Sequence, residues 1–244
     1  MPFPHVVTFS SLIVSLPRID STIVRSKIAW SCYLVNVLDA ESSEEPQRRS
    51  DGEQTHTVIL EAAMRLASIE GLGSLTVGRL ARELDISKSG VFAHFRSKER
   101  LQRETIDAAQ AVFDREVVRP GLAAPAGLAQ VENLCEAYLR YVERRVFPGG
   151  CFFAQLLAEY DAPAGAIHDA VAEGQRGWLG LLEGLITTAK DQGELHPAID
   201  ATQLAFELYA ALELANYLFI LYSDPAMTDR GRHAIRTAIA RSTP

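Results

Sequence analysis

Cysteine is scarce in this sequence, and neither glycine nor proline is enriched. The 244 residues include three cysteines, Cys32, Cys135 and Cys151, an odd number without paired spacing. This usage argues against a disulfide framework and fits a reducing compartment, so we expect a cytoplasmic protein. With 16 glycines, 11 prolines and a hydrophobic fraction of 48%, collagen-like and mucin-like chains are excluded and an ordinary globular composition remains.

The amino-terminal region lacks an apolar run that could cross a bilayer. Its two apolar stretches, 6–16 and 28–38, are each about eleven residues long, whereas a spanning helix needs about 20. No basic residue precedes the first stretch, so we expect neither a secretory signal nor a membrane partner. The polar run that follows predicts a flexible linker, and residues 1–52 are expected to form a poorly ordered extension. Either this extension is genuine or the natural start lies later, at a GTG codon for Val35 or Val37.

Motifs of the common enzyme classes are also missing. The chain has no phosphate-binding loop, no His-Glu-x-x-His, no Cys-x-x-Cys and no dinucleotide fingerprint. Residues 149–151 (Gly-Gly-Cys) resemble a nucleophile turn only weakly, because a base would have to come from His168 or His196 without any supporting pattern. We therefore expect no enzyme, no cofactor and no metal site.

Positive charge is in the minority, yet it is concentrated in one place. The chain carries 24 Lys and Arg against 31 Asp and Glu, a net charge of -7. Residues 86–103, in contrast, hold five basic side chains and one acidic one, while 101–244 carry -7. A nucleic-acid site, if present, must therefore be local to 86–103.

Two short helices separated by a tight turn are predicted in front of and within this basic segment. An amphipathic helix from residue 57, with apolar residues three and four apart, ends at Gly71 and Gly73. Thr76 and Ser87 are then suitable caps for helices at 77–84 and 88–95, respectively. This spacing is typical of a helix-turn-helix motif, whose second helix enters the major groove of DNA.

The DNA-facing residues follow from their positions on the second helix. Short or flexible side chains at its amino end approach base edges, and later positions reach sugar and phosphate. Taken singly, such residues are more often helix caps, core side chains or solvated charges than DNA contacts, so the prediction depends on their joint order. The candidate DNA-binding residues are Thr76, Ser87, Lys88, Ser89, Gly90, Phe92, His94 and Lys98.

The run LTVGRLARELDISKSGVFAHFRSKERL (75–101), preceded by ILEAAMRLASIEGLGS (59–74), closely resembles the DNA-binding region of the tetracycline-repressor (TetR) family of bacterial regulators. The resemblance covers about 45 residues in order. It implies that Thr76 and Lys98 clamp phosphates at helix starts. Phe92 departs from the family pattern, in which Tyr is common, so a hydroxyl contact to phosphate is missing. Gly90, where Thr or Ser is frequent, removes another contact.

The remainder of the chain is predicted to be helical throughout. Apolar periodicity predicts helices at 97–118, 128–146, 151–159, 167–189 and 201–222, with a loop at 120–127. The expected class is all-α, with a three-helix helix-turn-helix domain at 53–100 and a larger helical domain at 101–244 for ligand sensing and dimerisation.

The last two predicted helices carry apolar seams, and helix 201–222 is apolar nearly all round, which suggests burial on every side. We expect both helices to pair with their mates in a homodimer, so that two reading helices meet an inverted-repeat operator. The seam residues chosen for this interface are Trp178, Leu181, Leu185, Leu208, Ala211, Ala215 and Leu218.

Aromatic residues of the same domain are candidates for a pocket that takes a small apolar or aromatic effector. They are Phe113, Tyr138, Phe153, Trp178, Phe206 and Tyr209. The alternative is that these side chains only fill the core. Redox sensing through Cys135 or Cys151 is a further, weaker alternative.

The sequence as a whole favours a DNA-binding transcriptional regulator that acts as a ligand-responsive repressor on double-stranded DNA. Two competing interpretations stay open at this stage. One is a helical interaction module that has lost DNA binding, consistent with the missing hydroxyl at Phe92. The other is an all-α enzyme, which no motif supports.

Overall fold

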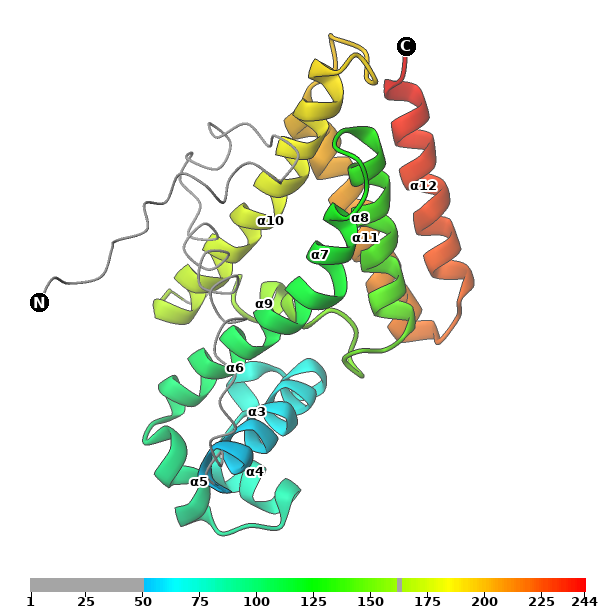
Figure 1. Cartoon of the computed structure of the whole chain (residues 1–244). Coiled ribbons are helices and arrows are strands. Elements are labelled where there is room, and N and C mark those ends of the chain that lie inside the picture. The colour runs from blue at the N-terminus through cyan, green and yellow to red at the C-terminus, as the bar shows by residue number, and fades with distance from the viewer. Residues whose placement is uncertain (1–50, 162–163) are drawn as a thin grey trace, which may run out of the picture. The chain divides into compact units, whose positions relative to one another are not determined.

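The computed structural model describes residues 51–161 and 164–244, and the regular elements within these ranges are all helical (Figure 1). The expectations for residues 1–50, an extension and a later start, lie outside the described residues. The prediction of an all-α chain with an amino-terminal helix-turn-helix and a larger helical part is confirmed.

The first helices form a compact head at the amino-terminal end of the described chain. It comprises α3 (Asp51–Glu70), the short turn η3 (Leu72–Ser74), α4 (Val77–Leu84) and α5 (Lys88–Phe95). Helices α4 and α5 have the predicted bounds. The apolar side chains of the head face inward, and its larger fully buried residues are Ile59, Leu72, Leu75, Leu80, Val91 and Phe95.

A long helical segment leads from the head to the rest of the chain. It begins as α6 (Lys98–Phe113), passes through the π turn η4 (Asp114–Val118) and ends as α7 (Arg119–Leu122). The expected loop at 120–127 therefore starts too early, because Pro120 lies inside helix α7. The wider π turn explains this: the Arg119 N–H donates to the Asp114 carbonyl, and Pro120, which has no N–H, sits at the start of α7.

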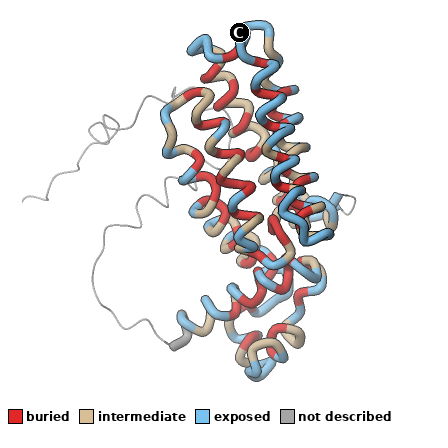
Figure 2. Tube along the Cα trace, turned by 90° about the vertical axis from the view of Figure 1, so that its right-hand side faces the viewer, coloured by how far each residue is buried: buried red, intermediate tan, exposed pale blue. Residues whose placement is uncertain are grey.

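Five helices make up the body: α8 (Leu128–Glu143), α9 (Phe152–Glu159), α10 (Ala166–Asp191), α11 (Ala201–Tyr222) and α12 (Ala226–Ser242). Helix α8 contacts α10, α11 and α12, and α11 packs along both α10 and α12. Buried residues follow the facing sides of these helices, while exposed ones follow their outer sides (Figure 2).

Helix α12 is an element that the sequence analysis did not predict. Its inward side carries small residues rather than a run of large apolar ones, and Gly231 lies so close to α11 that a Cβ there would be 2.7 Å from the Cβ of Ala215. Helix α11 is the one helix in the described ranges long and apolar enough to cross a membrane. The core helix of a globular protein has the same composition, and 39% of its most apolar window is buried here.

Candidate functional site

The head presents a two-helix motif that local sequence builds. The Thr76 hydroxyl oxygen accepts a hydrogen bond from the Arg79 N–H at 3.1 Å, and the Ser87 hydroxyl oxygen accepts one from the Gly90 N–H at 3.0 Å. Between the helices Asp85 adopts a left-handed conformation, with φ of 53°, and ends α4. These two caps and this turn set the mutual orientation of α4 and α5.

Helix α5 buries one face and leaves the other free. Val91 and Phe95 are fully buried against the head core, whereas Lys88 and Ser89 at the amino end are exposed. Phe92 is 54% exposed, an unusual state for a large aromatic side chain. The outer face of α5 is therefore available to a partner such as a DNA groove.

Charges on the head divide into paired and unpaired sets. Arg79 forms ion pairs with Glu70 at 2.7 Å and with Glu83 at 2.8 Å, and Arg65 also pairs with Glu83. These hydrogen bonds hold the pKa of both carboxyl groups below its usual value. On the head and at the start of α6, the basic side chains that form no ion pair with a described residue are Arg82, Lys88, Arg96 and Lys98. Their positive charge remains free for a polyanion.

Lys98 and His94, like the capping residues Thr76 and Ser87, make contacts with the head. The Lys98 ammonium donates to the Gly73 carbonyl at 2.5 Å, although its side chain is exposed. The His94 ring is half-buried and lies 5.8 Å from the ring of His56, which in turn bonds to Glu104. The structure thus places Lys88, Ser89 and Phe92 on the free face, and Lys98 and His94 nearer its margin.

The body is joined to the head through the end of α9. The Glu159 carboxylate accepts hydrogen bonds from the N–H groups of Leu72 and Gly73, at 2.7 and 2.5 Å. Gly149, in the loop before α9, approaches α3 so closely that a Cβ there would lie 1.6 Å from the Ser68 carbonyl oxygen. Sequence reasoning missed this junction, because no motif marks it.

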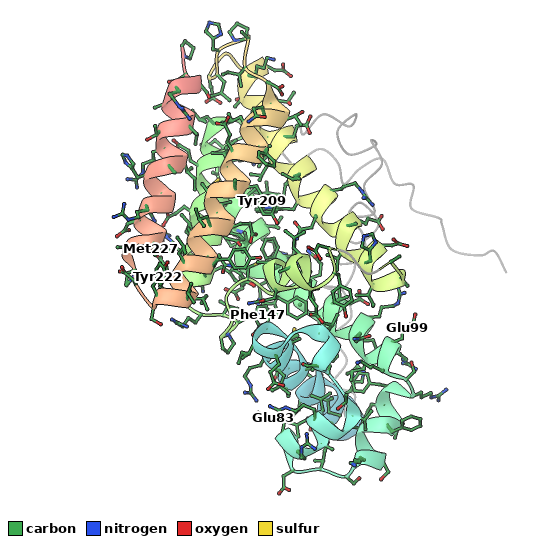
Figure 3. All side chains as sticks on the ribbon, turned by 180° about the vertical axis from the view of Figure 1, so that it is seen from behind. Glu83, Glu99, Phe147, Tyr209, Tyr222 and Met227 are labelled. Atoms are coloured by element: carbon green, nitrogen blue, oxygen red, sulfur yellow. The ribbon has the colours of Figure 1, made fainter. Side chains whose placement is uncertain are left out.

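A cluster of rings occupies the centre of the body, and we call it the inner aromatic cluster: Phe113, Tyr138, Tyr141, Phe153 and Trp178. Phe113 is its hub, with its ring centroid 5.2 Å from that of Trp178 and 5.7 Å from that of Phe153. Four of the six predicted ligand-binding residues belong to this cluster. Tyr209 is half-buried on α11 (Figure 3), whereas Phe206, on the same helix, is 61% exposed.

Polar groups next to the cluster were not predicted. The Tyr138 hydroxyl donates to the Glu213 carboxylate at 3.0 Å, and the Tyr209 hydroxyl donates to the Gln175 side chain at 2.6 Å. Burial raises the pKa of Glu213 to about 7, against the opposing effect of the hydrogen bond from Tyr138. The sequence did contain a signal for these polar groups, since Glu207 and Glu213 are the two charged residues of a helix that is otherwise mostly apolar.

The cysteines of the body are chemically quiet. Cys135 and Cys151 are both buried, and burial raises the pKa of each thiol to about 12. The reactive thiolate is therefore scarce at neutral pH, which disfavours the redox-sensing alternative. No group of three His, Cys, Asp or Glu side chains in the described ranges is arranged to hold a metal ion.

The seam predicted for dimerisation lies mostly inside a single copy of the chain. Trp178, Leu185, Leu208 and Ala215 are buried, and the other three seam residues are half-buried. They pack α10 and α11 within the body. The large apolar side chains left exposed on α11 are a different set: Phe206, Leu214, Tyr217, Leu221 and Tyr222.

Comparison with known families gives two matches, which together cover more than half of the chain. Residues 59–105 match the family described as "Bacterial regulatory proteins, tetR family". Residues 127–235 match the family described as "Tetracyclin repressor-like, C-terminal domain". Among curated proteins no match is found.

Solved structures share this fold over most of the described chain. A TetR transcriptional regulator from Chloroflexus aurantiacus is 24% identical, with a TM-score of 0.71, covering 79% of this chain and 97% of its own. A transcriptional regulator from Saccharomonospora viridis in complex with choline is 22% identical, with a TM-score of 0.66 and coverages of 78% and 98%. AibR, in complex with isovaleryl coenzyme A and operator DNA, is 17% identical, with a TM-score of 0.60 and the same coverages. On the two domain matches and this shared fold, the chain belongs to the TetR family of transcriptional regulators.

Proposed function

We propose that the protein is a ligand-responsive repressor that binds an inverted-repeat operator as a homodimer. The observation that carries this proposal is the free outer face of α5, where exposed Lys88 and Ser89 stand beside cations that have no carboxylate partner. A face of this size and charge suits the major groove. The solved structure of AibR with operator DNA supports the same role for this fold.

The proposed DNA contacts fall into two groups, those to base edges and those to phosphates. Lys88, Ser89 and Gly90 lie at the amino end of α5 and approach base edges, while Phe92 offers an apolar surface to a thymine methyl group or a sugar. The capping residues of α4 and α5, together with Lys98 at the start of α6, hold the head against DNA phosphates. His94 lies at the margin of this surface. The phosphate-contacting residues in this proposal are Thr76, Ser87 and Lys98.

A second copy of the chain covers the exposed face of α11. Phe206, Leu214, Tyr217 and Leu221 lie three, four or eight residues apart and so share one side of the helix. Helix α12 lies against α11, and its exposed side carries the small residues Ala234, Thr237 and Ala240 among charged ones such as Arg230 and Arg236. Two such pairs form a four-helix interface around a two-fold axis, with Ala211 and Leu218 at its edge. The interface thus combines α11 with α12 rather than with α10.

The effector acts from the inner aromatic cluster on the head through α9. At the start of α9, the Phe153 ring contacts Phe113 and the Phe152 ring contacts Phe147. At the end of the same helix, the Glu159 carboxylate binds the turn that follows α3. A ligand that shifts α9 therefore changes the position of the head and the spacing of the two reading helices. Complexes of relatives with choline and with isovaleryl coenzyme A support effector binding in this fold.

We place the boundary between the two functional domains at residue 100. We assign DNA binding to 53–100 and sensing and dimerisation to 101–244. Because the operator lies on the chromosome, the protein acts in the cytoplasm.

Selection of genomic fragments on the purified chain tests this function. We expect enrichment of a site with two-fold symmetry, whose half-site centres lie about 10 base pairs, or a multiple of this, apart. Enrichment without symmetry would contradict the homodimer, and the absence of any enriched fragment would contradict the regulator itself.

A further inference from the structure

Glu213 is a half-buried residue whose carboxylate has no cationic partner among the described residues. One carboxylate oxygen accepts the hydrogen bond from Tyr138, and the other, Oε2, is buried. The Tyr209 hydroxyl, which donates to Gln175, lies close enough to this carboxyl group to lower its pKa. None of the ion pairs in the described ranges includes Glu213. Its raised pKa is caused by burial, and no basic side chain opposes that effect. A carboxylate in this position is costly unless something positive approaches it.

Further unsatisfied polar groups surround the same rings. The indole Nε1 of Trp178, in the inner aromatic cluster, is buried without a hydrogen-bond partner in the described chain. So is the amide nitrogen of Gln110, one turn before Phe113 on α6. Folded proteins leave few such groups unpaired, and each costs stability. Three such groups, Gln110 Nε2 on α6, Trp178 Nε1 on α10 and Glu213 Oε2 on α11, point to a binding site whose occupant completes these hydrogen bonds.

The rings next to Glu213 suit a positive charge. Trp178 and Tyr138 lie 6.1 Å apart with an angle of 30° between their planes, and Tyr138 lies 6.2 Å from Tyr141. The faces of Trp and Tyr rings attract organic cations within about 6 Å, more strongly when water is excluded. A carboxylate and several aromatic faces therefore act on the same charge.

We propose that the inner aromatic cluster, with Glu213, is a receptor site for an organic cation that carries an apolar or aromatic body. This inference rests on the proposed function, because it names the effector class of the sensing domain. The ammonium group lies between Glu213 and the rings of Tyr138 and Trp178, and the body of the ligand contacts Phe113 and Phe153. The effector is thereby distinguished from neutral hydrocarbons and from carboxylic acids, both of which leave the Glu213 charge uncompensated.

Two probe molecules of the same shape, one cationic and one neutral, test directly whether the site prefers a positive charge. The full chain is titrated by calorimetry at pH 8 with phenyltrimethylammonium and, separately, with tert-butylbenzene, which has the same shape and no charge. We expect the cation to bind at least about tenfold more tightly. Equal or tighter binding of the uncharged probe, or no binding of the cation, would overturn the proposal, as would tight binding of a phenyl carboxylate.

The variant Glu213→Gln assigns the preference to one residue. It keeps the volume and the hydrogen bond to Tyr138 but removes the charge, so the two probes should then differ by less than about threefold. Glu207→Gln on the same helix is the matched control, since Glu207 is exposed and bonds to Gln203. An unchanged preference in Glu213→Gln would overturn the assignment. If that variant does not fold, the comparison of probes on the natural chain still decides.

DNA binding measured on the same preparations, without any cation, separates this inference from the proposed function. Operator binding together with equal affinity for both probes would overturn the cation site and support the regulator. A preference for the cation without binding to any DNA would support the site and overturn the regulator.

Discussion

The carboxylate of Glu159 accepts a hydrogen bond from the backbone N–H of Gly73 at 2.5 Å, although the two residues lie 86 positions apart in the chain. A second bond, from the Leu72 N–H at 2.7 Å, binds the other oxygen of the same carboxylate. Glu159 thus serves as a cap, supplied by the body, for a turn of the head. Charged hydrogen bonds of this type contribute more than neutral ones.

Replacement of this cap is expected to loosen the junction. Glu159→Ala should lower the free energy of unfolding by about 1–3 kcal/mol, because two backbone donors lose a charged acceptor. Amide hydrogen exchange at Leu72 and Gly73 should accelerate, while exchange in the core of α8 stays slow. Glu173→Ala, an exposed residue on α10, is the control. Unchanged exchange at both amides would contradict a role for Glu159 in holding the head.

Gly149 offers an independent test of the same junction. An alanine Cβ at this position would lie 1.6 Å from the Ser68 carbonyl oxygen, so backbone must move. We expect Gly149→Ala to cost about 1–3 kcal/mol of stability. Gly174→Ala, in the middle of α10 with nothing within 4 Å of its Cβ, should instead stabilise by about 0.5–1 kcal/mol. Thermal or urea unfolding checks both, and a stable Gly149→Ala protein would refute the close approach.

Stability should depend on pH through Glu213. Its pKa is about 7 in the folded chain against an ordinary value of 4.5, so the folded state holds the proton more tightly. Ionisation of Glu213 therefore lowers the free energy of unfolding as pH rises above about 4.5. The loss is complete above about pH 7, where it amounts to at most about 3 kcal/mol. Glu213→Gln removes it. This variant should therefore unfold at a higher temperature than the natural chain at pH 8.

At pH 5 most of that advantage should disappear, since Glu213 is then largely protonated in the folded chain. Circular dichroism melts at the two pH values measure the difference, and Glu207→Gln, at an exposed position of the same helix, is the control. A stabilising effect of equal size at both pH values would contradict the buried charge as its cause.

The exposed face of α11 should control assembly. Leu214→Glu and Leu221→Glu place charges on side chains that are 59% and 71% exposed in one copy of the chain. If a second copy covers them, each substitution should raise the dimer dissociation constant at least about 100-fold, because an unpaired charge would be buried. Sedimentation velocity measures the change. Val58→Glu, an exposed apolar position on α3, should leave assembly unaltered, and a dimer that survives both substitutions would rule out this interface.

Local sequence features, above all the helix-capping residues, were sufficient to predict much of the fold. Helices α4, α5 and α11 have their predicted bounds because each begins at a capping side chain, respectively Thr76, Ser87 and Asp200. Helix α12 was missed because its buried side has two large apolar residues, Ile235 and Ile239, among small or polar ones such as Thr228, Gly231 and Ser242, which gives little apolar periodicity.

Packing between distant segments accounts for what sequence reasoning could not reach. Helix α11 is apolar nearly all round, so its periodicity cannot distinguish the side that meets α10 and α12 from the side that stays free; Phe206 and Leu208 look alike in sequence but are 61% and 0% exposed. The position of Glu213 beside Tyr138 and Tyr209 likewise depends on how α8 and α11 meet.

Lys88 should contribute to DNA binding through its charge at the amino end of α5. Lys88→Ala is expected to weaken operator binding by about tenfold and to reduce the slope of log affinity against log salt concentration by about one for each Lys88 that contacts a phosphate. Arg176→Ala, an exposed cation on α10, should leave affinity and slope unchanged. An equal loss in both variants would show that only net charge matters.

The most direct measurement is the affinity of the purified chain for a selected inverted repeat, compared with the same DNA after one half-site has been scrambled. Two reading helices held by one dimer predict a loss of at least about 100-fold on scrambling, with two protomers bound to the intact site. Equal affinity for the two DNAs, or one protomer on the intact site, would contradict the central claim that paired α5 helices read the operator.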